Sequence, residues 1–128
     1  MEDYLVRATL AAPRGLGPVE AIAAALIAVS DDMFVGERQS LARHRQAIIA
    51  AHPDLREREL IKMASLASAL AGALRDRGVP EPGASLAAEA GVAIFKVSFE
   101  RWVSGAQPRP LSELIRESLQ DLKSVTAD

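Results

Sequence analysis

The stretch that decides the fold is residues 82–104, which read PGASLAAEAGVAIFKVSFERWVS. In a helix with about 100° of rotation per residue, its apolar side chains cover two neighbouring flanks and its charged ones share a narrow arc. An ordinary surface helix has a single apolar stripe of roughly 100°. We therefore expect neighbours on two sides, either within one domain or with one side against a second copy. The first flank holds Leu86, Ala87, Ala90, Ile94 and Val97, and the second holds Ala88, Val92, Phe95, Phe99 and Trp102.

The composition of the whole chain favours an all-α protein. Of 128 residues, 49% are hydrophobic but only 4% are aromatic, and helix-favouring alanine and leucine are abundant. We expect one domain, residues 1–128, with a substantial core. The net charge of −2 argues against a chain that binds nucleic acid by itself. The absence of cysteine excludes disulfides and thiolate metal sites, which fits a reducing compartment.

Targeting and membrane-spanning patterns are not evident in the sequence. Residues 1–13 carry acidic side chains rather than the basic start of a signal peptide. The longest apolar run, residues 21–29, is much shorter than the roughly 20 residues that a membrane helix needs. We expect a soluble, cytoplasmic protein that does not contact a membrane.

Glycine, proline and apolar periodicity divide the chain into about six expected helices. They cover about residues 2–12, 18–33, 37–51, 55–77, 82–104 and 110–125. Asp54 and Glu57 are expected to form a capping box at the start of the fourth helix, and Gly78 to cap its end. The side chains expected to face inward are Leu41, Ile48 and Ile49 in the third helix, and Leu60, Met63, Leu66, Ala67, Leu70 and Leu74 in the fourth.

The last two helices are expected to form an antiparallel hairpin that dimerises. In the last helix, residues 111, 115, 118, 122 and 125 follow the four- and three-residue spacing of a four-helix bundle. A hairpin of two helices cannot bury two apolar faces by itself. Pairing with the same hairpin of a second protomer would give a symmetric four-helix bundle. The predicted dimer interface comprises Val92, Phe99, Trp102, Leu111, Ile115, Ser118 and Leu122.

Small and flexible side chains along the long helices allow a second interpretation of the interior. Gly72 and Gly91 lie within helices, where each costs roughly 1 kcal/mol relative to alanine. They allow either close contact between helices or space for a ligand. Methionines suit either a core or an adaptable pocket. The candidate ligand-binding residues are Met33, Phe34, Ile48, Met63, Leu66, Ala67, Leu70, Gly91 and Phe95.

Catalytic and metal-binding patterns are missing from the sequence. His44 and His52 are eight residues apart and lack a zinc-binding context, so solvated or capping histidines are expected instead. Gly15 and Gly17 precede a helix but lack the third glycine and the strand of a phosphate loop. The basic group of Arg38, Arg43, His44 and Arg45 is interpreted as a solvated helix face. We expect no enzyme activity, no catalytic residue, no metal and no cofactor.

Residues 45–125 resemble the C-terminal ligand-binding and dimerisation domain of the tetracycline-repressor (TetR) family of transcriptional regulators. The matching features are residues 52–56 at the start of a long helix, and residues 90–95 running on to Phe99 and Trp102. The loop with Pro108 and Pro110 and the final residues 111–119 also match. The helix-turn-helix that is diagnostic of the family is missing from these 128 residues.

This resemblance implies a repressor domain that binds a hydrophobic effector among its middle helices. Effector binding would change the spacing of two DNA-binding heads on a homodimer, and the operator would be released. DNA contact would then occur only through the missing N-terminal domain. The alternative is a structural or adaptor homodimer of helical bundles that binds no small molecule.

Overall fold

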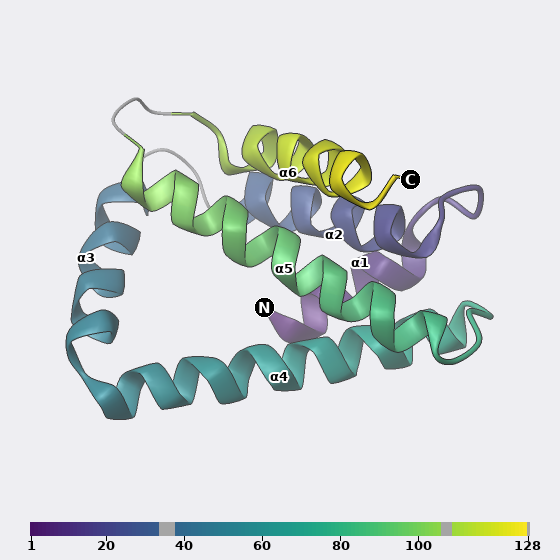
Figure 1. The fold of residues 1–128 in the computed structure, drawn as a ribbon, viewed down its shortest axis with the longest axis horizontal. Helices are drawn as coiled ribbons and strands as arrows, with labels where there is room; N and C mark the ends of the chain where they lie inside the picture. Colours follow the sequence, from purple (N-terminus) through teal and green to yellow (C-terminus); the bar gives the residue numbers. More distant parts are fainter. Residues whose placement is uncertain (34–37, 106–108, 128) are drawn as a thin grey trace.

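The structure, a computed structural model, describes residues 1–33, 38–105 and 109–127. These residues form six α-helices and contain no strand, which confirms the predicted all-α class (Figure 1). Each helix lies where the sequence predicts one, within three residues at either end. In chain order they are α1 (Glu2–Ala11), α2 (Pro18–Met33), α3 (Arg38–Ala51), α4 (Pro53–Asp76), α5 (Gly83–Ser104) and α6 (Leu111–Thr126).

Helix α5 lies at the centre and packs against four other helices. It contacts α2, α3, α4 and α6, while α1 lies against α2 and α4. The α4 and α5 helices lie side by side near their connection and diverge toward the other end (Figure 1). There α3 runs between the start of α4 and the end of α5 (Figure 1). The long helix predicted as central therefore has neighbours on more than two sides.

The α4 helix ends just before a glycine, Gly78, in the connection to α5. Gly78 has a φ of +95°, a left-handed conformation that glycine adopts without steric cost. The amide of Val79 donates to the carbonyl of Leu74 at 3.0 Å, as in a helix that ends on a glycine cap. The predicted role of Gly78 is confirmed. The α4 helix ends there and α5 returns antiparallel to it.

The start of α4 differs from the prediction of a capping box. The helix begins at Pro53, and its N-cap is His52, which makes no side-chain capping bond. Proline suits the first helical position because its φ is already fixed and it has no amide to leave unpaired. Asp54 therefore lies inside the first turn, where its negative charge interacts favourably with the helix dipole.

Three residues predicted to face inward are exposed instead. Leu41, Ile48 and Leu60 belong to the exposed large hydrophobic residues, with Leu41 at 70% and Leu60 at 67% exposure. The apolar pattern on α3 and on the first half of α4 is real, but no element of the described chain covers it there. The prediction was wrong at these positions because periodicity identifies an apolar face without showing what packs on it.

The antiparallel hairpin of α5 and α6 is confirmed (Figure 1). Within it, the buried hydroxyl of Ser98 donates to Ser118 Oγ at 2.9 Å and lies 3.3 Å from the carbonyl of Leu114. At the rim, Arg101 and Arg109 both pair with Glu117, at 3.6 and 2.9 Å. The apolar side of α6 is shared between α5 and α2. Helix α2 thus covers surface that the sequence assigned to a partner.

The two glycines inside helices have different environments. A Cβ atom on Gly91 would lie 2.5 Å from Cγ2 of Ile22, which is closer than real side chains approach. Gly91 therefore lets α5 and α2 come into close contact. A Cβ atom on Gly72 would meet only the end of the Arg75 side chain, at 3.6 Å. Close contact between helices therefore explains why position 91 is a glycine, but it does not explain the glycine at position 72.

Alanine substitutions at the two glycines should therefore change stability in opposite directions. Gly91→Ala overpacks the contact with Ile22 and should lower the free energy of unfolding by about 1–3 kcal/mol. Gly72→Ala is the matched control and should raise it by up to about 1 kcal/mol, because alanine favours the helix. Urea unfolding followed by circular dichroism measures both. Equal effects of the two substitutions would contradict the close contact.

Arg77 joins the end of α4 to the end of α1, a contact that the sequence analysis missed. Its Nη1 donates to the carbonyls of Thr9, Leu10 and Ala12 at 3.1, 3.3 and 2.7 Å, and its Nη2 donates to Pro13 at 3.1 Å. The last carbonyls of a helix lack partners within it, and a cation is favourable there. Arg77 therefore caps α1.

Replacing Arg77 by lysine should destabilise the protein, because a single ammonium group cannot bind four carbonyls as the planar guanidinium does. Arg77→Lys should lower the free energy of unfolding by about 1–3 kcal/mol. The control is Arg75→Lys, which weakens only the exposed pair with Glu81 at 3.2 Å and should cost less than about 1 kcal/mol. Urea unfolding compares the two. A cost no larger than that of the control would rule out the cap.

Candidate functional site

Helix α3 is attached to the rest of the chain mainly through polar groups. None of its 14 described residues is buried. Gln39 Nε2 donates to the carbonyl of Trp102 at 2.6 Å. Arg43 donates through Nε to the carbonyl of Val103 at 2.6 Å and through Nη2 to that of Gly105 at 3.1 Å. These carbonyls lie at the end of α5, where helical partners are lacking, so α3 caps α5.

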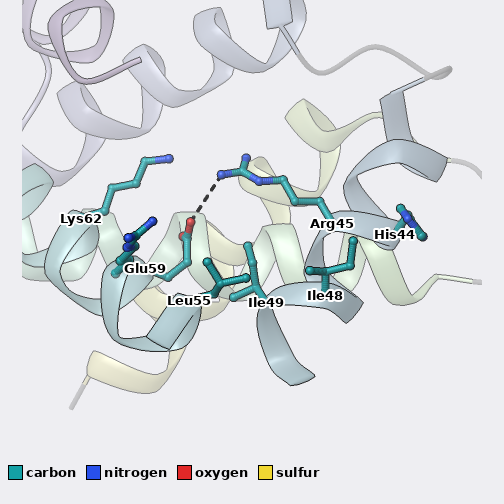
Figure 2. Close-up of a pocket in the computed structure, with 8 residues that line it drawn as sticks. His44, Arg45, Ile48, Ile49, Leu55, Glu59 and Lys62 are labelled. Carbon is teal, nitrogen blue, oxygen red and sulfur yellow. Dashed lines mark ion pairs between the residues drawn. The ribbon is translucent and has the colours of Figure 1, made fainter. Parts of the chain in front are cut away.

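A surface hollow of about 420 Å³ lies between α3 and α4 (Figure 2). Its apolar part comes from both helices, and charged side chains surround it. Arg45 of α3 forms an ion pair with Glu59 of α4 at 3.6 Å, marked by the dashed line in Figure 2. This ion pair joins the two sides of the hollow. The lining residues are His44, Arg45, Ile48, Ile49, Leu55, Arg58, Glu59 and Lys62.

Five of the nine predicted ligand-binding residues lie in the core. Leu66, Ala67, Leu70 and Phe95 are buried among the core residues, and the space beside Gly91 is occupied by Ile22. The interior at these positions is therefore filled by the chain's own side chains.

The remaining predicted ligand-binding residues lie nearer the surface. Met33 and Met63 are partly buried against the core. Ile48 is exposed and lines the hollow between α3 and α4. Phe34 lies outside the described residues. The predicted set is thus divided among three places and does not surround one cavity.

Three aromatic side chains follow one side of α5 toward the helix end that α3 caps. The ring centroids of Phe95 and Phe99 are 5.8 Å apart, and those of Phe99 and Trp102 are 5.6 Å apart. Both pairs are tilted, within the range of favourable aromatic contacts. Trp102 is buried, whereas Phe99 is partly buried. Their spacing of four and three residues was the sequence signal for this row.

The predicted dimer-interface residues also separate into two groups. Trp102, Leu111, Ile115 and Ser118 are buried within the chain itself. Val92, Phe99 and Leu122 are partly buried against the core. The exposed apolar side chains of α5 are instead Leu86 at 67% and Val97 at 49%, with the exposed Ala93 and the half-buried Ala90 between them. These four residues, spaced by four, three and four, form the outer stripe of α5.

The charged side chains near the start of α6 form ion pairs with one another. Hydrogen bonding from Arg109, aided by the charge of Arg101, lowers the pKa of Glu117 below its usual value. The same carboxylate, together with Glu113, raises the pKa of Arg109. These charges stay paired with one another at the surface. They join the start of α6 to the end of α5 through Arg101.

The described residues offer no group of three or more His, Cys, Asp or Glu side chains arranged to hold a metal ion. The ring of His52 lies 2.7 Å from the carbonyl of Ile48 and so meets the end of α3. Within the described part of the chain, no helix is long and apolar enough to cross a membrane.

These features define the class of protein as an all-helical domain. Comparison with known families identifies it further. The model of the MftR C-terminal domain family matches residues 16–127, and the chain belongs to this family of TetR-type C-terminal domains. Such domains are regulatory. No curated protein matches the chain at a significant level.

Proposed function

We propose that this chain is the effector-sensing and dimerisation domain of a TetR-type transcriptional repressor. A hydrophobic small molecule would control DNA binding by a helix-turn-helix domain that these 128 residues do not include. The match over residues 16–127 is the observation that carries the proposal. The outer stripe of α5 and the partly buried apolar side chains of α2, α4 and α5 support its two parts, which are dimerisation and effector binding.

The dimer interface is proposed on the outer stripe of α5. Leu86 and Val97 provide apolar area that the chain leaves exposed, and Ala90 and Ala93 let a second helix approach closely. Two copies of α5 crossing antiparallel near Ala93 would bury this stripe in an isologous contact. At that crossing, Glu89 would lie at the level of the partner's Lys96, which gives charge complementarity on the edge of the stripe.

A charge at the C-terminal end of this stripe should prevent dimerisation. Val97→Glu would place a carboxylate against the apolar surface of the second copy, so the protein should sediment as a 13.6 kDa monomer. Leu41→Glu is the matched control, because Leu41 is more exposed and lies on α3. Sedimentation velocity of both variants at equal concentration measures the difference. A dimer of unchanged stability in Val97→Glu would exclude this interface.

The effector site is proposed beneath α3, where it faces α4 and the aromatic row of α5. Three partly buried apolar side chains are proposed to contact the effector, namely Met33 of α2, Met63 of α4 and Phe99 of α5. Methionine side chains adapt to ligands of irregular shape, and aromatic rings offer large apolar contact areas. The family to which the chain belongs supports an effector site in this domain.

A charge at this place should weaken effector binding. A panel of apolar compounds is titrated against the protein, and binding is followed by thermal shift and by fluorescence of Trp102, the single tryptophan. Met63→Lys should weaken the binding of an active compound at least tenfold, whereas Leu60→Lys, on the exposed part of the same helix, should leave it unchanged. Circular dichroism shows that both variants are folded. Equal binding by both variants would place the site elsewhere.

A second candidate function, a helical adaptor without a ligand, is favoured by one observation. The interior beside Gly91 is filled by Ile22, and Leu66 and Leu70 are almost completely buried. An adaptor needs a packed interior and a dimer surface only. If the panel gives no thermal shift while Val97→Glu still yields monomers, the adaptor is the better description.

A further inference from the structure

Helix α3 differs from the other helices in how it is held. The helices α2 and α5 have seven and eight buried residues, whereas none of the described residues of α3 is buried. Burial of apolar side chains is the main source of helix stability in a folded protein. The attachment of α3 therefore depends on a few hydrogen bonds, on partly buried side chains such as Ala42, and on its chain connections to α2 and α4. Segments with few buried contacts open more readily than the core does.

The hydrogen bonds between α3 and α5 form a latch, which we define as Gln39 and Arg43 with the carbonyls of Trp102, Val103 and Gly105. The three distances are 2.6, 2.6 and 3.1 Å. Arg43 donates two of these bonds from one guanidinium group, and hydrogen bonds from charged donors are stronger than neutral ones. Both donors lie in the first half of α3. The latch thus closes the end of α3 that is far from α4.

The other end of α3 has the features of a hinge. Only His52 lies between Ala51, the last residue of α3, and Pro53, the first of α4. His52 has an extended backbone, with a φ of −124° and a ψ of 112°. Proline provides no amide to continue hydrogen bonding from α3 into α4. A change of the backbone angles at His52 can therefore alter the angle between α3 and α4 without breaking the hydrogen bonds within α4, while residues 34–37 keep α3 joined to α2.

We propose that α3 is a hinged lid, which turns at His52 when the latch opens and gives an apolar effector access to the side chains beneath it. This inference rests on the proposed function, because it assigns regulation to the same site. Opening requires the loss of the three latch bonds. The ion pair between Arg45 and Glu59, whose side chains are 68% and 30% exposed, also joins α3 to α4. An ion pair with a solvent-exposed partner contributes little, so the latch controls the opening.

Hydrogen exchange of the ligand-free protein tests the lid. Arg43→Met keeps an apolar stem of similar length but removes both donated bonds. It should speed amide exchange in α3 about tenfold and leave exchange in α2 and α6 unchanged. The matched control is Arg45→Met, which removes the same charge from the same helix but leaves the latch, and should change α3 exchange less than twofold. Exchange of α3 as slow as that of α2 in the unmodified protein would overturn the lid.

The single tryptophan provides a second measurement. Trp102 is 2% exposed, and its carbonyl accepts the bond from Gln39. Opening of the lid should expose its ring, so quenching of its fluorescence by acrylamide should at least double in Arg43→Met and remain unchanged in Arg45→Met. Gln39→Ala removes one bond only and should give an intermediate increase, which covers the case in which Arg43→Met does not fold. Equal quenching in all four proteins would contradict the latch.

Binding of an apolar dye tests the proposed lid and the proposed effector site independently. The association rate of anilinonaphthalene sulfonate with the folded protein should rise several-fold in Arg43→Met if α3 covers the entrance. Faster exchange of α3 with an unchanged association rate would show that the lid opens but is not the entrance, and would overturn the proposal. If the dye binds none of the proteins, the effector site fails as a proposal, while the exchange data decide on the lid separately.

Discussion

The close contact between α5 and α2 at Gly91 is the constraint on which the other helix positions depend. Because Gly91 lacks a side chain, Ile22 lies directly against the backbone of α5. This distance places α2 under the hairpin of α5 and α6, where it covers the apolar side of α6. Ser98 and Ser118 can then join α5 to α6 within a region closed to water. A larger residue at position 91 would separate α2 from α5 and uncover surface on three helices at once.

The sequence predicted the helices well because their signals are local. Proline, glycine and apolar periodicity act within a few residues, and the role of Gly78 follows from its lack of a side chain alone. Whether a face is covered depends on distant parts of the chain. Trp102, Leu111 and Ile115 looked available for a partner, yet α2 and the rest of the chain bury them. The Arg77 cap joins residues more than sixty positions apart, so no local pattern reveals it.

The candidate site was less predictable for the same reason. Its expected residues share the chemistry of a pocket, but that chemistry also suits a core, and Leu66 and Leu70 lie in the core. Of the two residues that attach α3, Arg43 was interpreted as part of a solvated helix face, and Gln39 was not singled out. Their partners are backbone carbonyls at the end of α5. Every residue has a backbone carbonyl, so a contact with one cannot be recognised from the residue types in the sequence.

Three contacts that matter for the proposed function are made by α5. Its inner face packs on α2, its outer stripe is the proposed dimer contact, and its last carbonyls hold α3. A ligand can shift such a system only through different affinities for its two states. An effector beneath α3 would contact the aromatic row one to two turns from the residues that the latch binds. A change in the position of α5 there would reach the outer stripe through a rigid helix, since Gly91 and Ile22 leave no space for α5 to bend inward. The tight packing of the core leaves little room for a ligand. The same packing would transmit the effect of ligand binding along α5 to the second copy.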